Sequence, residues 1–235
     1  MRFFYILLIL LVVSCGKSKE KEVVAESADL EAVSTDSKCE TETSFGDIDI
    51  CFPHIKGMKE CYSDPRVKTH VDYTGMDGNV ILGYYFSDET YANADQLGEI
   101  AYDDYFKVYA VEQLKNMKIT SKDMNDLKKV IEETTLKSDW NAVKNNIEKQ
   151  LEGFSFGKPI LIESYQPRSD IWSFLTLMNV VSGDQENTLV MNMSMVKIKD
   201  RLIYYAHYLD YEDEETLKSS KTKSDRFGLA LLSLN

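Results

Sequence analysis

The feature that most constrains the fold is a block of alternating apolar and polar side chains between residues 159 and 209. The side chains of 171–178 and 189–196 change character at every second position, which is the period of a strand that buries one face. Turn-forming residues separate the runs at 183–187 and at Asp200-Arg201, where we expect a two-residue turn. Because strands joined by short turns pair with their neighbours, the block predicts an antiparallel meander. The expected strands are 159–165, 170–180, 188–198 and 202–209.

Patterns outside this block complete the expected fold class. Strands are predicted at 48–52 and 105–112, and a hairpin over 71–86 around the turn dipeptide Asp77-Gly78. Helical spacing of apolar residues predicts a helix after Thr120 or Ser121 and a last helix over 213–232. A further helix is expected over 138–153. Strands and helices in this order predict an α+β fold, with a central antiparallel sheet and helices packed on it.

The last part of this layout resembles the PsbP/Mog-like group. The resemblance comes from a basic-turn hairpin running into the aromatic strand Arg201-Leu202-Ile203-Tyr204-Tyr205. An acidic linker and a terminal amphipathic helix that closes on Leu-Asn follow it. It covers 47–235 in layout and includes no diagnostic motif. It implies a central antiparallel sheet sandwiched by helices. Members of this fold are mostly non-enzymatic accessory and binding proteins, so the resemblance implies such a role by analogy, since fold alone does not specify function.

The first fifteen residues resemble a bacterial lipoprotein signal peptide. A basic Arg2 precedes the apolar run 3–13, whose eleven residues suit a signal peptide and are too few for a transmembrane helix. Val12, Val13 and Ser14 stand directly before Cys15, as in a lipobox. The resemblance implies cleavage after residue 14, a lipid on Cys15 and an acylated amino terminus, typically with palmitate. The alternative is an ordinary signal peptide that ends near a chance cysteine.

We expect three regions along the chain: the signal peptide 1–14, a lipidated cysteine with a disordered tether over 15–46, and one α+β domain over 47–235. Residues 16–46 are rich in Lys, Glu, Ser, Thr and Ala without an apolar period. Gly16 follows Cys15, at the position where an Asp would resemble an inner-membrane retention signal. Because that Asp is absent, the expected location is the outer membrane, facing either the periplasm or the cell surface.

Three cysteines remain after Cys15: Cys39, Cys51 and Cys61. In an oxidising compartment they allow one disulfide and one free thiol, in three possible pairings. The surroundings of Cys61 are typical of a loop, whereas Cys51 lies in a short strand and could be a buried thiol. We therefore favour a bridge that includes Cys61, with Cys39 as its partner if Cys51 is buried.

The sequence argues against several chemistries. A formal net charge of −12 disfavours nucleic acid as a partner, because such a partner needs positive potential. The histidines His54, His70 and His207 form no pair with metal-ligand spacing, so no metal and no cofactor are implied. The acidic run 210–215 is expected to stabilise the start of the last helix. No motif of a serine or cysteine nucleophile is present, and no catalytic residue is assigned.

The remaining candidate feature is aromatic. If one face of the sheet is open, a binding surface is expected around Tyr84, Tyr105, Trp172 and Tyr205. The alternative, which we favour, is that helices cover both faces. Together these features predict a membrane-anchored envelope lipoprotein that is a non-catalytic accessory or binding module for an envelope protein. An envelope hydrolase or thiol enzyme is the second hypothesis, and a carrier of a small apolar ligand is the third.

Overall fold

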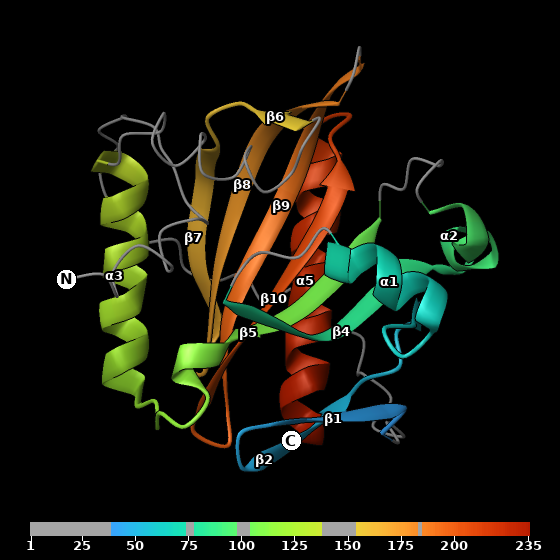
Figure 1. The fold of residues 1–235 in the computed structure, drawn as a ribbon. Coiled ribbons are helices and arrows are strands. Elements are labelled where there is room, and N and C mark those ends of the chain that lie inside the picture. The colour runs from blue at the N-terminus through green and yellow to red at the C-terminus, as the bar shows by residue number, and fades with distance from the viewer. Residues whose placement is uncertain (1–38, 74–77, 98–103, 138–153, 183–184) are drawn as a thin grey trace.

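The computed structural model describes residues 39–73, 78–97, 104–137, 154–182 and 185–235, and an antiparallel sheet of eight strands lies at its centre (Figure 1). The strand order is β3-β4-β5-β10-β9-β8-β6, and β7 also pairs with β8. The strands are β3 (Met58–Glu60), β4 (Asn79–Ser87), β5 (Tyr105–Val111), β6 (Phe154–Phe156), β7 (Ile160–Arg168), β8 (Ile171–Ser182), β9 (Gln185–Ile198) and β10 (Arg201–Asp210).

The predicted meander is confirmed, because β7, β8, β9 and β10 pair in chain order and every pair is antiparallel. The turn between β9 and β10 lies one residue earlier than predicted. Lys199 and Asp200 have φ values of 46° and 60°, so they are the central residues of this turn, and Arg201 already pairs with Ile198. Two consecutive residues with positive φ give a backbone twist that matches the twist of the two strands.

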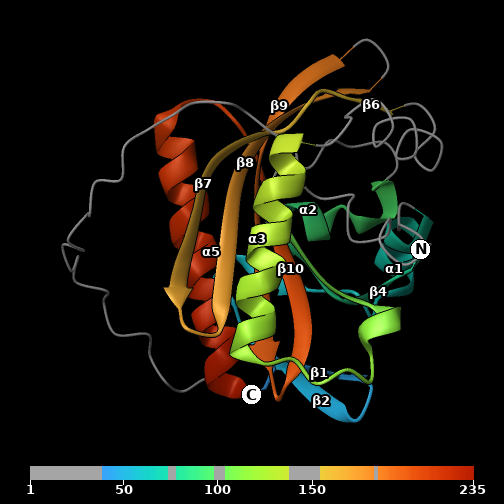
Figure 2. The ribbon, with the colours of Figure 1, turned by 90° about the vertical axis from the view of Figure 1, so that its left-hand side faces the viewer.

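The sheet is covered on both faces, which confirms the α+β class (Figure 2). Phe227 and Leu231 of the last helix pack on one face, which we call the α5 face. Met124 and Ile131 of α3 pack on the other, which we call the α3 face, and α1 covers its β4 side. The helices are α1 (Pro65–Tyr73), α2 (Asp88–Ala92), α3 (Ser121–Lys137) and α5 (Glu214–Leu234), with 3-10 turns η2 (Ala94–Gln96) and η3 (Glu112–Leu114).

Both long helices begin where the sequence predicts. At α3, Thr120 and Asp123 exchange hydrogen bonds between side chain and backbone N–H, so they form a reciprocal cap. At α5, the Asp213 carboxylate accepts hydrogen bonds from the backbone N–H groups of Glu215 and Thr216. The acidic residues before α5 therefore stabilise its positive end.

Two local predictions were wrong, and two short strands were missed. A strand, β1 (Thr41–Phe45), pairs with β2 (Ile48–Phe52) inside the stretch assigned to the tether, so the folded part begins before residue 47. Residues 71–73 belong to helix α1 rather than to a hairpin arm, because Asp64 caps a helix that starts with Pro65. Strands β3 and β6 were not predicted. The helix expected at 138–153, the signal peptide and residues 15–38 lie outside the described residues.

The disulfide prediction was also wrong. Cys39 bonds to Cys51, with Cα atoms 5.3 Å apart, and Cys61 is a free, buried thiol. The β1–β2 hairpin explains the pairing, because Glu42 lies opposite Cys51 and the N–H of Glu40 donates to the carbonyl of Phe52. The hairpin therefore brings Cys39 beside Cys51.

Candidate functional site

Strands β5 and β10 form the centre of the α3 face, where Tyr109, Tyr204 and Ala206 belong to the core cluster that includes Met124 and Ile131 of α3. The register pairs Tyr109 with Tyr204, Lys107 with Ala206, and Tyr105 with Tyr208. Because side chains alternate along a strand, all six point to the same side of the sheet. We call this set the tyrosine–lysine face: Tyr105, Lys107, Tyr109, Tyr204, Ala206 and Tyr208.

The four tyrosines of this face form two stacked pairs. The rings of Tyr109 and Tyr204 are nearly parallel, at 13°, with centroids 5.3 Å apart. The rings of Tyr105 and Tyr208 are 4.6 Å apart at 11°, and Tyr84 of β4 extends this second stack at 5.6 Å. Stacking of this kind adds about 0.5–1.5 kcal/mol per pair beyond the area that it buries, so both pairs are held in place.

Two hydroxyl groups of the face have no hydrogen-bond partner. The side chains of Tyr109 and Tyr204 are each only 3% exposed, and the hydroxyl oxygens of both are buried and unpartnered. Burial raises the pKa of both phenols, so the hydroxyls keep their protons and can donate. An unsatisfied buried polar group costs about 1–3 kcal/mol, and most folded proteins contain few of them. Four other buried side-chain atoms of the described residues also have no hydrogen-bond partner, in Thr41, Asn192, Arg201 and Ser224.

Lys107 lies between the two stacked pairs. Its Nζ is 5.6 Å from the centroid of the Tyr109 ring, and no described carboxylate forms an ion pair with it. The residue keeps some exposed area, yet it is packed closely enough that burial lowers the pKa of its ammonium group to about 8.

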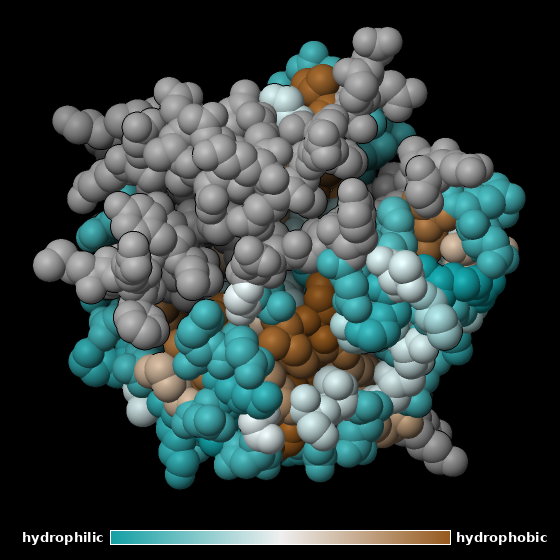
Figure 3. Space-filling view, in the orientation of Figure 1, coloured by the Kyte–Doolittle hydropathy of each residue, from teal (hydrophilic) through white to brown (hydrophobic). Residues whose placement is uncertain are grey.

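Figure 3 shows the same side of the molecule, where apolar side chains are visible between more polar ones near the centre of the view. Towards α3, Trp172 is half-buried and donates its indole N–H to the amide oxygen of Asn125 at 3.1 Å. The Lys128 ammonium lies over the Trp172 ring, 5.1 Å from its centroid. Met191, Met193 and Met195 of β9 lie opposite Tyr208, Ala206 and Tyr204, so thioether side chains border the face on this side.

The structure separates the four residues of the predicted aromatic surface. Tyr84 and Tyr105 lie at the tyrosine–lysine face, and Trp172 lies at its α3 border. Tyr205 lies on the opposite face: it is fully buried beneath α5, and its hydroxyl donates to the carbonyl of Ser224. Tyr205 is therefore not a surface residue, because neighbouring positions on a strand point to opposite sides.

The sequence analysis missed Lys107, Tyr109 and Tyr204 as site residues. The alternation of Tyr105, Lys107 and Tyr109 along one strand places them on one face. The pairing of this strand with β10, about a hundred residues later in the chain, has no comparable signal in the sequence.

A second polar network contains the side-chain types of a hydrolase triad. The Nδ1 of His207 is 3.1 Å from the Ser220 hydroxyl, and its Nε2 is 2.9 Å from the Asp104 carboxylate. Lys223 pairs with the same carboxylate. Burial raises the pKa of Asp104, whereas hydrogen bonds from His207 and Lys223 lower it. The lowering effects together are larger, so the net pKa is below its usual value. His207 and Ser220 have no exposed surface, so no substrate can reach the hydroxyl in this conformation.

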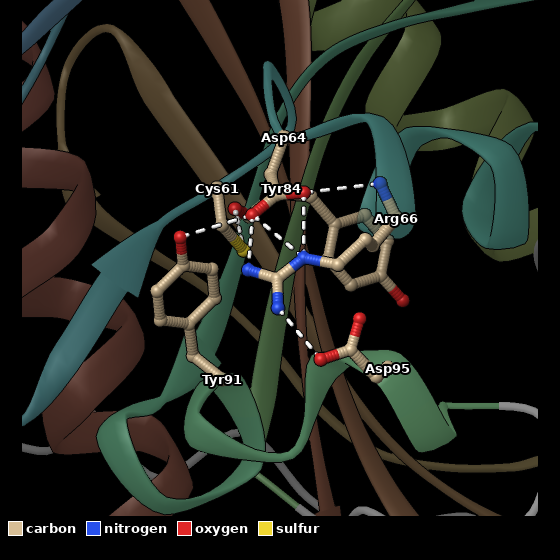
Figure 4. Close-up of polar contacts among 6 residues, drawn as sticks. All are labelled: Cys61, Asp64, Arg66, Tyr84, Tyr91 and Asp95. Atoms are coloured by element: carbon tan, nitrogen blue, oxygen red, sulfur yellow. Dashed lines mark hydrogen bonds and ion pairs between the residues drawn. The ribbon is translucent and has the colours of Figure 1, made fainter.

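A third cluster lies at the start of α1 (Figure 4). Arg66 binds the Asp64 carboxylate at 2.6 Å and Asp95 at 3.1 Å, and the hydroxyl of Tyr91 donates to Asp64. The Arg66 hydrogen bonds hold the pKa of Asp64 well below its usual value. All of these groups have partners, and the cluster ties α1 to η2, so it is structural.

Neither cysteine environment provides a thiolate. Burial raises the pKa of Cys61 to about 12, and its thiol donates to the carbonyl of Tyr84. Cys51 is in the disulfide, and His54 lies beside Glu40, with Nδ1 3.3 Å from the carboxylate. Among the described residues no group of three or more His, Cys, Asp or Glu side chains could hold a metal ion. No helix in the described ranges has the length and apolar character needed to cross a membrane.

No family model matches the sequence, and no curated protein matches it. Among solved structures, the chain is similar to the Saccharomyces cerevisiae Ran-binding protein Mog1p, with 11% identity and a TM-score of 0.30. That match covers 82% of this chain and 92% of the other. A mutant of Mog1 matches with 12% identity and a TM-score of 0.32, over 83% and 88% of the two chains. Both proteins share their name with the group that the layout of 47–235 resembles. At these TM-scores the likeness carries no argument about function.

Proposed function

We propose that this protein is a non-catalytic binding module, held at the outer membrane by a lipid on Cys15, and that it binds through the tyrosine–lysine face. The observation that carries the binding proposal is Lys107, a partly exposed lysine that lies between two stacked tyrosine pairs and forms no ion pair with a described carboxylate. A lysine packed among aromatic rings usually has a carboxylate beside it, so an acidic group of a partner would complete this environment.

The environments of the reactive side chains support a non-catalytic role. Ser220 and His207 are fully buried, Cys61 is a buried thiol, and Cys51 is in a disulfide. A nucleophile must reach its substrate and be activated by a neighbour. Ser220 is the described serine that lies beside a histidine, and it is not accessible.

The anchoring part of the proposal comes from the lipobox at 12–15. If Cys15 carries the lipid, the tether ends at Cys39, where the disulfide joins the chain to β2. A flexible chain of this length has a root-mean-square span of about 25 Å. The domain would then be able to meet a partner within a few nanometres of the membrane.

The test is site-specific photocrosslinking of the full-length protein in its own cells. A benzophenone amino acid replaces Tyr208, a half-buried aromatic residue of the face, and in a control it replaces Arg226, which is exposed on α5. We expect one saturable adduct from position 208 and none from 226, identified by mass spectrometry. A Cys15→Ala variant should lose this adduct or show it displaced to another compartment.

Equal or no crosslinking from the two positions would contradict the binding proposal. An unchanged adduct and unchanged membrane fractionation of the Cys15→Ala variant would contradict the anchoring proposal alone. The two parts of the proposal can therefore fail independently.

A further inference from the structure

Four lysines in the described part of the chain lie over an aromatic ring. Three of them also pair with a carboxylate: Lys68 with Asp72 at 2.9 Å, Lys128 with Glu132 at 2.7 Å, and Lys221 with Glu163 at 2.8 Å. Lys107 is the exception, because its Nζ lies 5.6 Å from the Tyr109 ring centroid and no described carboxylate pairs with it. Its ammonium form therefore lacks the partner that stabilises the charge of the other three.

The surroundings of Lys107 also disfavour its charged form. In the strand register, Tyr84 of β4 lies opposite it on one side and Ala206 of β10 on the other. The stacked rings of Tyr105 and Tyr208 lie next to this position along the same two strands. Burial lowers the pKa of Lys107 to about 8, so about one molecule in ten carries the neutral amine near pH 7. An ordinary lysine, with a pKa of about 10.4, carries it in fewer than about one molecule in a thousand.

Lys107 keeps some exposed surface, unlike Tyr109 and Tyr204 beside it, which are buried. It is therefore the polar side chain at the centre of the face that a dissolved molecule meets. A neutral amine is a nucleophile, whereas an ammonium group is not, and lysines in apolar surroundings form Schiff bases with carbonyl compounds. A partly exposed lysine beside aromatic rings and without a counter-charge provides the conditions for that reaction.

From this arrangement we infer that Lys107 is a site of covalent modification by small aldehydes, with aromatic aldehydes favoured because rings surround the amine. The Nζ lone pair attacks the carbonyl carbon, and one amine proton moves to the carbonyl oxygen, which gives a carbinolamine. The hydroxyl group then leaves with the second amine proton as water, and an imine remains. Nothing is oxidised or reduced. This inference goes beyond the proposed function, because it concerns the protein alone and needs no partner.

The test is reductive alkylation of the full-length protein with benzaldehyde and sodium cyanoborohydride, which converts each imine into a stable benzylamine. Peptide mapping by mass spectrometry gives a rate for each lysine. At about pH 7 we expect Lys107 to react about tenfold or more faster than Lys128 and Lys221, which lie over rings but have carboxylate partners. At about pH 10 this advantage should shrink severalfold, because ordinary lysines then lose their protons as well.

A pair of variants tests the missing counter-charge. Tyr208→Glu places a carboxylate beside Lys107 and should slow its alkylation severalfold, whereas the neutral Tyr208→Gln should slow it less. Circular dichroism establishes that each variant is folded. In denaturing urea all lysines of the wild type should react alike. Equal rates at Lys107, Lys128 and Lys221 in the folded wild type, or an advantage of Lys107 that persists in urea, overturns the inference. Equal effects of the two folded variants overturn it as well, because the missing carboxylate is then not the cause.

Discussion

Gly228 of α5 lies directly against the hydroxyl of Tyr205, so close that a Cβ atom at this position would be 2.2 Å from the phenol oxygen and 3.0 Å from Ile171 Cδ1. The missing side chain lets α5 approach β10 and lets the Tyr205 hydroxyl donate to the carbonyl of Ser224 at 3.1 Å. The distance between the helix and the sheet is therefore limited by one glycine and one tyrosine.

Gly228→Ala should destabilise the protein. In an open helix the change would stabilise by about 1 kcal/mol, but forcing a methyl group into a packed interface typically costs about 1–3 kcal/mol. We expect a net loss, measured by urea denaturation, with Thr222→Ala on the exposed side of α5 as the control. Adding Tyr205→Phe removes the closest atom, so the double variant should lose less than the sum of the two single losses. Additive losses would show that the two residues are not coupled.

The disulfide between Cys39 and Cys51 should stabilise the β1–β2 hairpin and its attachment to the sheet. The bridge closes a loop of twelve residues, which corresponds to about 3 kcal/mol in the chain-entropy model. The variant Cys39→Ser/Cys51→Ser should lose about this amount in urea denaturation. In peptide mapping without reduction, Cys39 and Cys51 should be found linked, and Cys61 should react with iodoacetamide only after denaturation. A bridge that contains Cys61 would contradict the structure.

Asp225 should make stability depend on pH in the weakly acidic range. Burial is the main cause that raises the pKa of Asp225 to about 6, and the charge of Glu163 also raises it. A hydrogen bond from Tyr165 and the charge of Lys221 lower this pKa by less. The folded state therefore binds the proton more tightly than the unfolded state. This contribution is fully present below about pH 4 and is lost as the pH rises through about 6.

Asp225→Asn should therefore stabilise the protein at about pH 8, by about 1 kcal/mol because partial exposure screens the effect, and have little influence near pH 4. The measurement is the free energy of unfolding across this range for both proteins. The control is Asp126→Asn, which removes an exposed carboxylate on α3. A difference between wild type and Asp225→Asn that does not grow with pH would refute the assignment.

Ser220 should be chemically inert in the folded protein, because it and its partner His207 have no exposed surface. A fluorophosphonate probe should not label the native full-length protein under conditions in which an active serine hydrolase is labelled completely. Labelling that disappears in Ser220→Ala would instead support the hydrolase hypothesis. The same variant should lose about 1–3 kcal/mol of stability, because Nδ1 of His207 then has no buried partner.

Local patterns in the sequence were sufficient for much of the fold. The alternation over 171–178 and 189–196 identified strands β8 and β9, since burial of one face of a strand has a period of two residues. Thr120 and Asp213 marked the starts of α3 and α5, because a cap is formed within a few residues. The misassigned helix at 65–73 lacked a clear apolar stripe, and the short strands β3 and β6 are too short for a pattern to emerge.

The site depended on contacts between distant parts of the chain. The sequence by itself determined that Tyr105, Lys107 and Tyr109 share one face of a strand, and that Tyr204 and Tyr205 point to opposite faces. Only the tertiary structure decided that β5 lies beside β10, which brings Lys107 between two tyrosine pairs and buries Tyr205 beneath α5. It also decided that Cys39 pairs with Cys51. The periodicity of a segment indicates which of its side chains face the core. Strand order and register depend on how the whole chain packs, so they cannot be predicted from one segment alone.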